Sequence, residues 1–227
     1  MSELFIRVIS ATILGLISFW MIYLGNTFLL GYVGLASSIL IWEVLCFKGI
    51  RSGKIYRVLF SALVGLSTVA VYHPSIFLIY VFLVIGLGLI YLRSDIMLSC
   101  VFIYIYGAVT LLLIMLTSNT LNFGVQQLIF LIFVVTLTDV GGYFFGRFLK
   151  GPKLLPAVSP NKTWSGIFGG WLLTFLLAFF VSNFFSMKLV NVFLLGLFLS
   201  VSSQLGDLLE SKVKRFYGIK NSGVIIP

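Results

Sequence analysis

The chain has 227 residues, of which 60% are hydrophobic and only 9% are charged, and its mean hydropathy is +1.17. A soluble domain carries about 25% charged residues, so this composition excludes an ordinary soluble enzyme or binding domain. The formal net charge of +9 is carried by few residues. Together these values predict a polytopic membrane protein.

Apolar stretches recur along the whole chain. A hydrocarbon core about 30 Å thick needs roughly 20 apolar residues per helix, so we expect an all-α membrane helix bundle of about eight transmembrane helices. The expected spans are 4–24, 28–47, 58–72, 75–92, 96–116, 124–145, 164–184 and 190–209. The first is too long for the apolar part of a signal peptide and lacks a small-x-small cleavage site, which favours a retained helix.

The basic residues predict the orientation of these spans. With eight spans and a cytoplasmic N-terminus, fourteen of the fifteen Lys and Arg residues fall in cytoplasmic segments and only Lys188 lies outside. Because cytoplasmic loops carry the excess of Lys and Arg, both termini are expected in the cytoplasm. The positive charge would then face anionic headgroups on one side of the membrane.

The character of the sequence changes along the chain. We divide it into N-terminal membrane helices, residues 1–123, and a catalytic-type membrane region, residues 124–227. Cys46 and Cys100 lie in apolar runs without metal-ligand spacing and are expected to be small buried hydrophobes. From Thr138 onward, polar residues gather in two blocks that the charge distribution places on one side of the membrane.

Asp139 opens the first polar block. It follows an apolar run, residues 128–137, that contains no compensating charge. A carboxylate within a membrane helix costs on the order of 3 kcal/mol at mid-span and less near an end. Asp139 is either an acid at the membrane interface or a ligand for a cation or nucleotide. The glycine pairs Gly142/Gly146 and Gly166/Gly170 have the spacing of helix-packing motifs, although glycine also admits a bulky ligand.

The segment 159–164 ends the first polar block. Pro160 keeps Ser159 extended, and we expect the residues that follow to open the seventh helix. Backbone amides, hydroxyls and Lys162 at a helix N-terminus would form an anion site. The alternative is an ordinary N-cap with a lysine that sets topology. Asn161-Lys162-Thr163 is formally a glycosylation sequon, but its expected cytoplasmic location argues against that use.

The second polar block, residues 203–215, enters a membrane helix. Asp207, Ser211 and Lys214 fall on one helical face. A carboxylate with a hydroxyl one turn later can hold a hard divalent cation, and phosphate oxygens can complete its coordination shell. Lys214 and Arg215 could neutralise those phosphates, an arrangement suited to phosphoryl-type transfer. The alternative is a charged helix exit with i,i+4 pairs.

These blocks resemble the signature of the phosphatidate cytidylyltransferases, or CDP-diglyceride synthetases, of the bacterial inner membrane. The resemblance covers roughly residues 130–227, and the N-terminal half agrees only in hydrophobicity. The matching motifs are Asp139-x-Gly141-x-Tyr143-x-x-Gly146-Arg147, Ser159-Pro160-x-Lys162-Thr163-Trp164-x-Gly166 with Gly169-Gly170, and Gly206-Asp207-Leu208-x-Glu210-Ser211-x-x-Lys214-Arg215.

The resemblance implies an activity and a set of roles. The reaction would transfer CMP from CTP to phosphatidic acid, giving CDP-diacylglycerol and pyrophosphate with Mg²⁺ or a similar divalent cation. Asp207 would be catalytic and a metal ligand, with Lys214 and Arg215 catalytic as phosphate contacts. Ser211 would also contact phosphate, and Asp139, Ser159 and Lys162 would line the nucleotide pocket. The implied location is the inner membrane, with the site on its cytoplasmic face.

Two departures from the family pattern bear on activity. The family reads Lys-Asp where this chain has Lys220-Asn221, and the family's further Gly-His-Gly-Gly and Asp-Arg-x-Asp segments do not follow Pro227. We therefore expect a chain truncated within its signature, and such a chain could be an inactive or split remnant that needs the missing segment. A different lipid cytidylyltransferase, a polyprenol-type kinase and a small membrane transporter subunit also stay open as functions. The expected partners are CTP, phosphatidic acid and membrane lipids, without nucleic acid; a homo-oligomer stays open.

Overall fold

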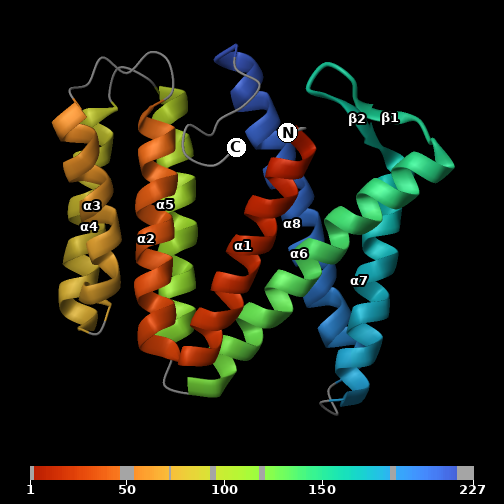
Figure 1. The fold of residues 1–227 in the computed structure, drawn as a ribbon, viewed down its shortest axis with the longest axis horizontal. Coiled ribbons are helices and arrows are strands. Elements are labelled where there is room, and N and C mark those ends of the chain that lie inside the picture. Colours follow the sequence, from red (N-terminus) through yellow and green to blue (C-terminus); the bar gives the residue numbers. More distant parts are fainter. Residues whose placement is uncertain are drawn as a thin grey trace. The chain divides into compact units, whose positions relative to one another are not determined.

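Eight helices and one two-stranded hairpin make up the described part of the chain (Figure 1). The computed structural model describes residues 3–46, 54–71, 73–92, 96–117, 121–184 and 188–218. The helices are α1 Glu3–Leu24, α2 Asn26–Leu45, α3 Lys54–Ala70, α4 Pro74–Tyr91, α5 Ile96–Thr117, α6 Leu121–Leu149, α7 Trp164–Phe184 and α8 Leu189–Phe216; the strands are β1 Lys153–Leu155 and β2 Ser159–Thr163.

The helices fall where the apolar stretches predict them. Among the described residues, five are long and apolar enough to cross a membrane: α2, α5, α6, α7 and α8. Shorter apolar segments lie within α1, α3 and α4. The protein is therefore a multi-pass helical membrane protein, whereas the full set of eight spans and the orientation stay predictions. Part of the basic charge used for the orientation, including Lys48, Arg51, Arg93 and Lys220, lies outside the described residues.

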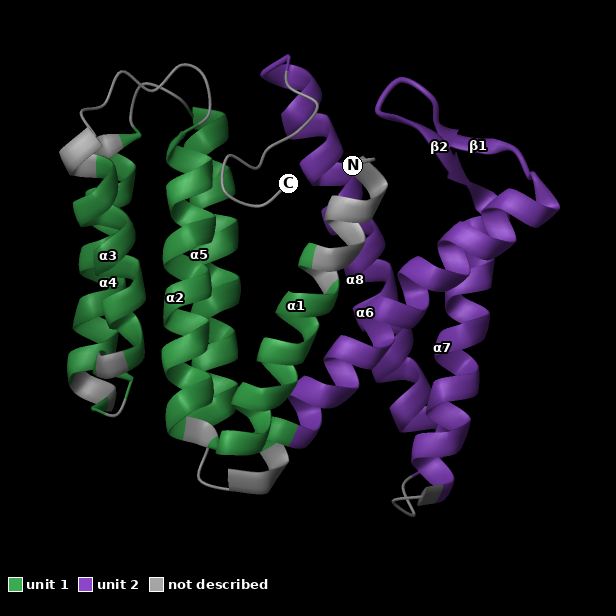
Figure 2. Cartoon of the chain, in the orientation of Figure 1, with its two compact units in different colours: residues 1–125, 220–227 green, residues 126–219 purple. Residues whose placement is uncertain are grey.

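The chain divides into two compact units (Figure 2). In unit 1, which holds α1–α5, α2 packs against α1, α3 and α5, and α4 packs against α3 and α5. Its interior is mostly apolar and aromatic. The largest fully buried side chains include Phe102 and Tyr106 of α5, whose rings stack with centroids 5.9 Å apart.

Unit 2, the described part of residues 126–219, holds most of α6, the hairpin, α7 and α8. Glycines let α6 and α7 approach backbone to backbone. A Cβ on Gly166 would lie 2.6 Å from the carbonyl oxygen of Gly142, and one on Gly141 would lie 2.7 Å from that of Gly169. These contacts confirm the packing interpretation of the glycine pairs. Helix α8 packs against α7 and completes the unit.

The hairpin corrects one sequence expectation. Asn161, Lys162 and Thr163 do not open α7; they form strand β2, which pairs antiparallel with β1 and has Thr163 opposite Lys153. Pro160 favours extended backbone before it, and the amide of Trp164 donates to the carbonyl of Pro152, 3.0 Å away. The helix starts only at Trp164 because this cross-strand pairing holds the preceding residues extended. The bundle thus carries a small β element on an otherwise all-α fold.

Candidate functional site

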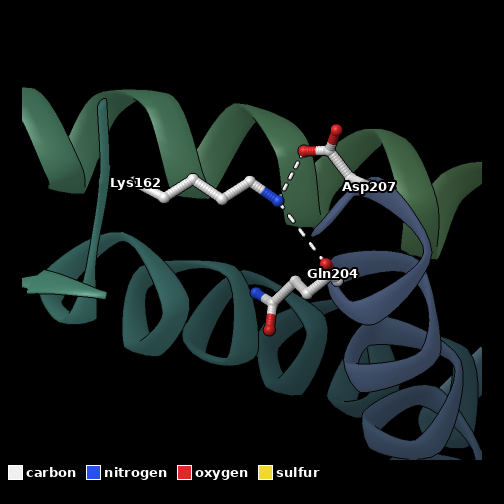
Figure 3. Close-up of polar contacts among 3 residues, drawn as sticks. All are labelled: Lys162, Gln204 and Asp207. Carbon is white, nitrogen blue, oxygen red and sulfur yellow. Dashed lines mark hydrogen bonds and ion pairs between the residues drawn. The ribbon is translucent and has the colours of Figure 1, made fainter. Parts of the chain in front are cut away.

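An ion pair joins the hairpin to α8. Lys162 Nζ of β2 lies 2.5 Å from Asp207 Oδ2, and it also donates to the Gln204 carbonyl oxygen at 3.5 Å. Figure 3 shows the extended Lys162 side chain reaching α8 at these two acceptors. The lysine side chain is 25% exposed, whereas that of Asp207 is 52% exposed. The carboxylate is therefore held by one cation and still open to a ligand.

Asp139 of α6 belongs to the same cluster. Its carboxylate interacts electrostatically with both Asp207 and Lys162, repelled by the first and attracted by the second. Three elements far apart in the sequence, α6, β2 and α8, thus bring two acids and one lysine together. We call Asp139, Lys162 and Asp207 the acid–lysine cluster. The sequence predicts all three as site residues, but its spacing alone does not predict the ion pair.

Hydrogen bonds at the N-terminus of α7 hold the end of β2, and so position Lys162. The Thr163 hydroxyl accepts a hydrogen bond from the amide of Gly166 at 3.2 Å, and it lies 3.0 Å from Ser165 Oγ. The Ser165 hydroxyl in turn accepts a bond from the amide of Gly151 at 3.2 Å. Thr163 therefore caps α7, and the hairpin base is tied to the helix. This cap fits the alternative of an ordinary N-cap, and it occupies one of the first-turn amides that an anion site would use.

Gln204 fastens the other side of the cluster. Its side-chain amide donates to the backbone carbonyl of Ile167 in α7 at 3.5 Å, while the backbone carbonyl of Gln204 accepts a hydrogen bond from Lys162. Gly170 leaves room for this side chain, because a Cβ there would lie 3.0 Å from Gln204 Nε2. Gln204 lies within the second polar block of the sequence, which does not by itself predict this contact. A polar residue in an apolar run, one turn before Asp207, is the signal that points to it.

The remaining residues of the polar face lie further along α8. Leu205, Leu209 and Phe216 of the same helix are exposed. Lys214 Nζ pairs with Glu210 Oε1 at 2.6 Å, an i,i+4 contact. The structure therefore places Lys214 in a salt bridge rather than with the acid–lysine cluster. Of the other predicted site residues, Ser211 is half-buried, Arg215 is exposed, and Ser159 begins β2.

The side chains of this site can be compared with the ligands that a divalent cation requires. Within the described ranges, no three His, Cys, Asp or Glu side chains gather as metal ligands. Mg²⁺ is commonly held by one or two carboxylates and completed by substrate phosphates and water. Asp207, with the charge of Asp139 near enough to act on it, fits that limited role. Lys220 and Asn221, where the resembled family has Lys-Asp and so one more carboxylate, lie outside the described residues.

The fold and the cluster define a multi-pass helical membrane protein with an acidic and basic site built by its C-terminal half. Comparison with known proteins gives the family. The model of the cytidylyltransferase family matches residues 5–227. The phosphatidate cytidylyltransferase of Brucella suis biovar 1 (strain 1330) is 31% identical over 243 residues, which cover 100% of this chain and 86% of that protein.

Staphylococcal relatives match a shorter part more closely. The phosphatidate cytidylyltransferase of Staphylococcus epidermidis (strain ATCC 35984) is 43% identical over 112 residues, 48% of this chain and 43% of that protein. That of Staphylococcus haemolyticus (strain JCSC1435) is 41% identical over 108 residues, 46% of this chain and 41% of that protein. The chain belongs to the cytidylyltransferase family. It is accordingly an enzyme of the nucleotidyltransferase class.

Proposed function

We propose that the chain transfers CMP from CTP to phosphatidic acid, giving CDP-diacylglycerol and pyrophosphate. The observation that carries the proposal is the acid–lysine cluster, in which α6, β2 and α8 bring Asp139, Lys162 and Asp207 together. The names of the curated relatives support the lipid substrate. A basic and acidic site in an apolar bundle suits a reaction between an anionic lipid and a soluble nucleotide.

The chemistry requires charge stabilisation more than covalent help from the protein. A phosphate oxygen of phosphatidic acid attacks the α-phosphorus of CTP, and the bond from that phosphorus to the oxygen bridging the β-phosphorus breaks. The electron pair leaves with pyrophosphate. Both substrates and the leaving group are anions, so positioned cations lower the barrier. When CTP binds, the Lys162 ammonium would leave the Asp207 carboxylate and pair with a phosphate of the nucleotide.

A divalent cation, expected to be Mg²⁺, would neutralise charge on the phosphates when bound. Asp207 would hold it, with Asp139 close by. Within the protein, Lys162 would orient the carboxylate of Asp207 before substrate arrives, and the backbone carbonyl of Gln204 would hold the lysine in place. Asp139 and Ser159 would line the nucleotide pocket. Ser211, Lys214 and Arg215 would contact phosphate, which requires Lys214 to leave Glu210.

The proposed location is the bacterial inner membrane, with both termini and the site on the cytoplasmic face. Phosphatidic acid would arrive laterally from the bilayer and CTP from the cytosol. This orientation is supported by the bias of Lys and Arg toward one set of segments. It also places the hairpin, which carries Lys153 and Lys162, on the side where the nucleotide is found.

The test uses the full chain purified and reconstituted in lipid with Mg²⁺ and phosphatidic acid. CTP is supplied with label on either the α- or the γ-phosphorus. Cytidylyl transfer puts the α-label, and not the γ-label, into a lipid product that forms only with phosphatidic acid. Lipid carrying the γ-label would identify a kinase instead. Absence of labelled lipid in both arms would overturn the proposed activity of this chain.

A further inference from the structure

Three buried hydroxyls join the helices of unit 2. Thr138 of α6, Thr174 of α7 and Ser200 of α8 are between 0% and 2% exposed. Thr138 Oγ1 donates to Ser200 Oγ at 2.8 Å, and Thr138 Oγ1 lies 3.5 Å from Thr174 Oγ1. We call these residues the hydroxyl junction. In an apolar environment such groups need partners, so the short bond between Thr138 and Ser200 favours one relative placement of α6 and α8.

The junction is connected to the acid–lysine cluster along two helices. Thr138 immediately precedes Asp139 in α6. Ser200 lies seven residues before Asp207, about two helical turns along the same face of α8. The intervening turn holds Gln204, whose side chain contacts α7. A shift of α6 against α8 would therefore change both the junction and the separation of the two carboxylates.

The two threonines of the junction are bonded differently. Thr138 makes the short bond between helices, whereas Thr174 Oγ1 donates within its own helix to the Gly170 carbonyl at 3.0 Å. Thr174 is equally buried but is only loosely joined to Thr138. Loss of the Thr174 hydroxyl leaves the bond between α6 and α8 intact. Thr174 is therefore a control matched in residue type, burial and location.

We infer that Thr138 is a positioning residue, whose bond to Ser200 sets the register of α6 against α8 and so aligns Asp139 with Asp207. The inference rests on the proposed function for its catalytic consequence. Apolar helix faces have no directional contacts that prevent sliding, whereas a hydrogen bond away from water fixes one geometry. Misplacement of a catalytic group by about 1 Å can reduce turnover roughly 100-fold.

The first arm of the test measures turnover and substrate dependence in the reconstituted full chain. Thr138→Val keeps the shape and removes the hydroxyl, and we expect kcat to fall about ten- to hundredfold with little change in the KM for CTP. Thr138→Ser should restore most of the rate. Thr174→Val should stay close to wild type. If Thr138→Val folds poorly, Ser200→Ala removes the same bond from the other helix.

The second arm needs no activity. Nitroxide labels are placed on cysteines replacing the exposed residues Val140 of α6 and Leu205 of α8, after Cys46 and Cys100 are changed to Ser. Pulsed electron–electron double resonance then measures the distance between the two labels, and so reports how α6 and α8 are placed relative to each other. We expect Thr138→Val and Ser200→Ala to broaden or shift the distance distribution, and Thr174→Val to leave it unchanged.

The two arms separate the inference from the proposed function. A broadened distribution in a protein without cytidylyl transfer would support positioning and contradict the function. Unchanged distances after Thr138→Val and Ser200→Ala would overturn positioning. So would turnover that falls equally in Thr138→Val and Thr174→Val, because a general loss of packing would affect both.

Discussion

The two units differ in where their polar contacts between helices lie: in unit 1 the hydroxyls of Ser18 and Tyr32 join α1 to α2, whereas in unit 2 such contacts lie close to charged residues. In unit 1, the hydroxyls of Ser37, Ser67 and Thr110 donate to carbonyls three or four residues earlier in their own helices. In unit 2, Thr138 donates to another helix, and Lys162 reaches from the hairpin to α8. A polar group that bonds within its helix leaves neighbouring helices unconstrained. One that bonds across helices fixes relative position, as a catalytic site requires.

The largest expected effect separates two acids of α8. Asp207→Asn removes the carboxylate that faces Lys162, and we expect kcat/KM for cytidylyl transfer to fall by at least about 100-fold, because this charge acts in the site. Glu210→Gln is the matched control, since Glu210 pairs only with Lys214 in the described contacts. Steady-state assays on reconstituted protein measure both. Equal losses in the two variants would contradict a special role for Asp207.

The next effect separates two lysines of the hairpin. Lys162→Gln removes the cation that contacts Asp207 and Gln204, and we expect roughly a 10- to 100-fold loss of kcat/KM. Lys153→Gln removes a charge from the exposed strand β1 of the same hairpin and should cost less than about threefold. Titration of CTP in the same assay distinguishes the two. A comparable loss in Lys153→Gln would indicate a general effect of surface charge.

Glycine substitutions test whether helix packing is tighter at the chosen position of unit 2 than at that of unit 1. Gly166→Ala would place a Cβ against the Gly142 backbone in unit 2, and overpacking of this kind costs about 1–3 kcal/mol. Gly107→Ala in unit 1 meets nothing within 4 Å and should be neutral or stabilising by up to about 1 kcal/mol. Thermal unfolding in detergent measures both. A lowered midpoint for Gly107→Ala alone would reverse the expected order.

The smallest effect concerns a hydroxyl of unit 1. Ser37 is buried, but its Oγ donates to the Gly34 carbonyl at 2.9 Å within α2. Ser37→Ala should change stability by about 0.5 kcal/mol or less, because that carbonyl already belongs to the helical ladder. Activity should be unchanged. A loss of activity as large as that of Thr138→Val would remove the distinction drawn between the units.

Hydropathy predicts the helices of this protein better than it predicts their ends. The expected span 96–116 nearly coincides with α5, Ile96–Thr117. In contrast, the spans 124–145 and 190–209 are shorter than α6, Leu121–Leu149, and α8, Leu189–Phe216. Apolar composition detects only the part suited to hydrocarbon, whereas backbone hydrogen bonding continues into the polar turns. Lys214 lies in those polar turns, and Asp207 lies at the end of the expected span, just before them.

The site was predictable in its members but not in its contacts. Asp139 and Asp207 stand out because carboxylates are expensive in membrane helices, and Lys162 stands out because it lies in a polar segment of a chain with few charges. The β2 strand was missed because its pairing with β1 depends on contacts such as Trp164 to Pro152, which local propensity does not specify. Thr174 was missed because one hydroxyl in an apolar run is compatible with a bond inside its own helix.

The most direct test of the central claim is a double-mutant cycle on Lys162 and Asp207, measured as kcat/KM in the reconstituted full chain. If the ion pair belongs to one site, removing either partner already disables that site, and Lys162→Gln with Asp207→Asn should be little worse than Asp207→Asn alone. Losses that multiply in the double variant would show that the two residues act independently and would contradict a shared acid–lysine site.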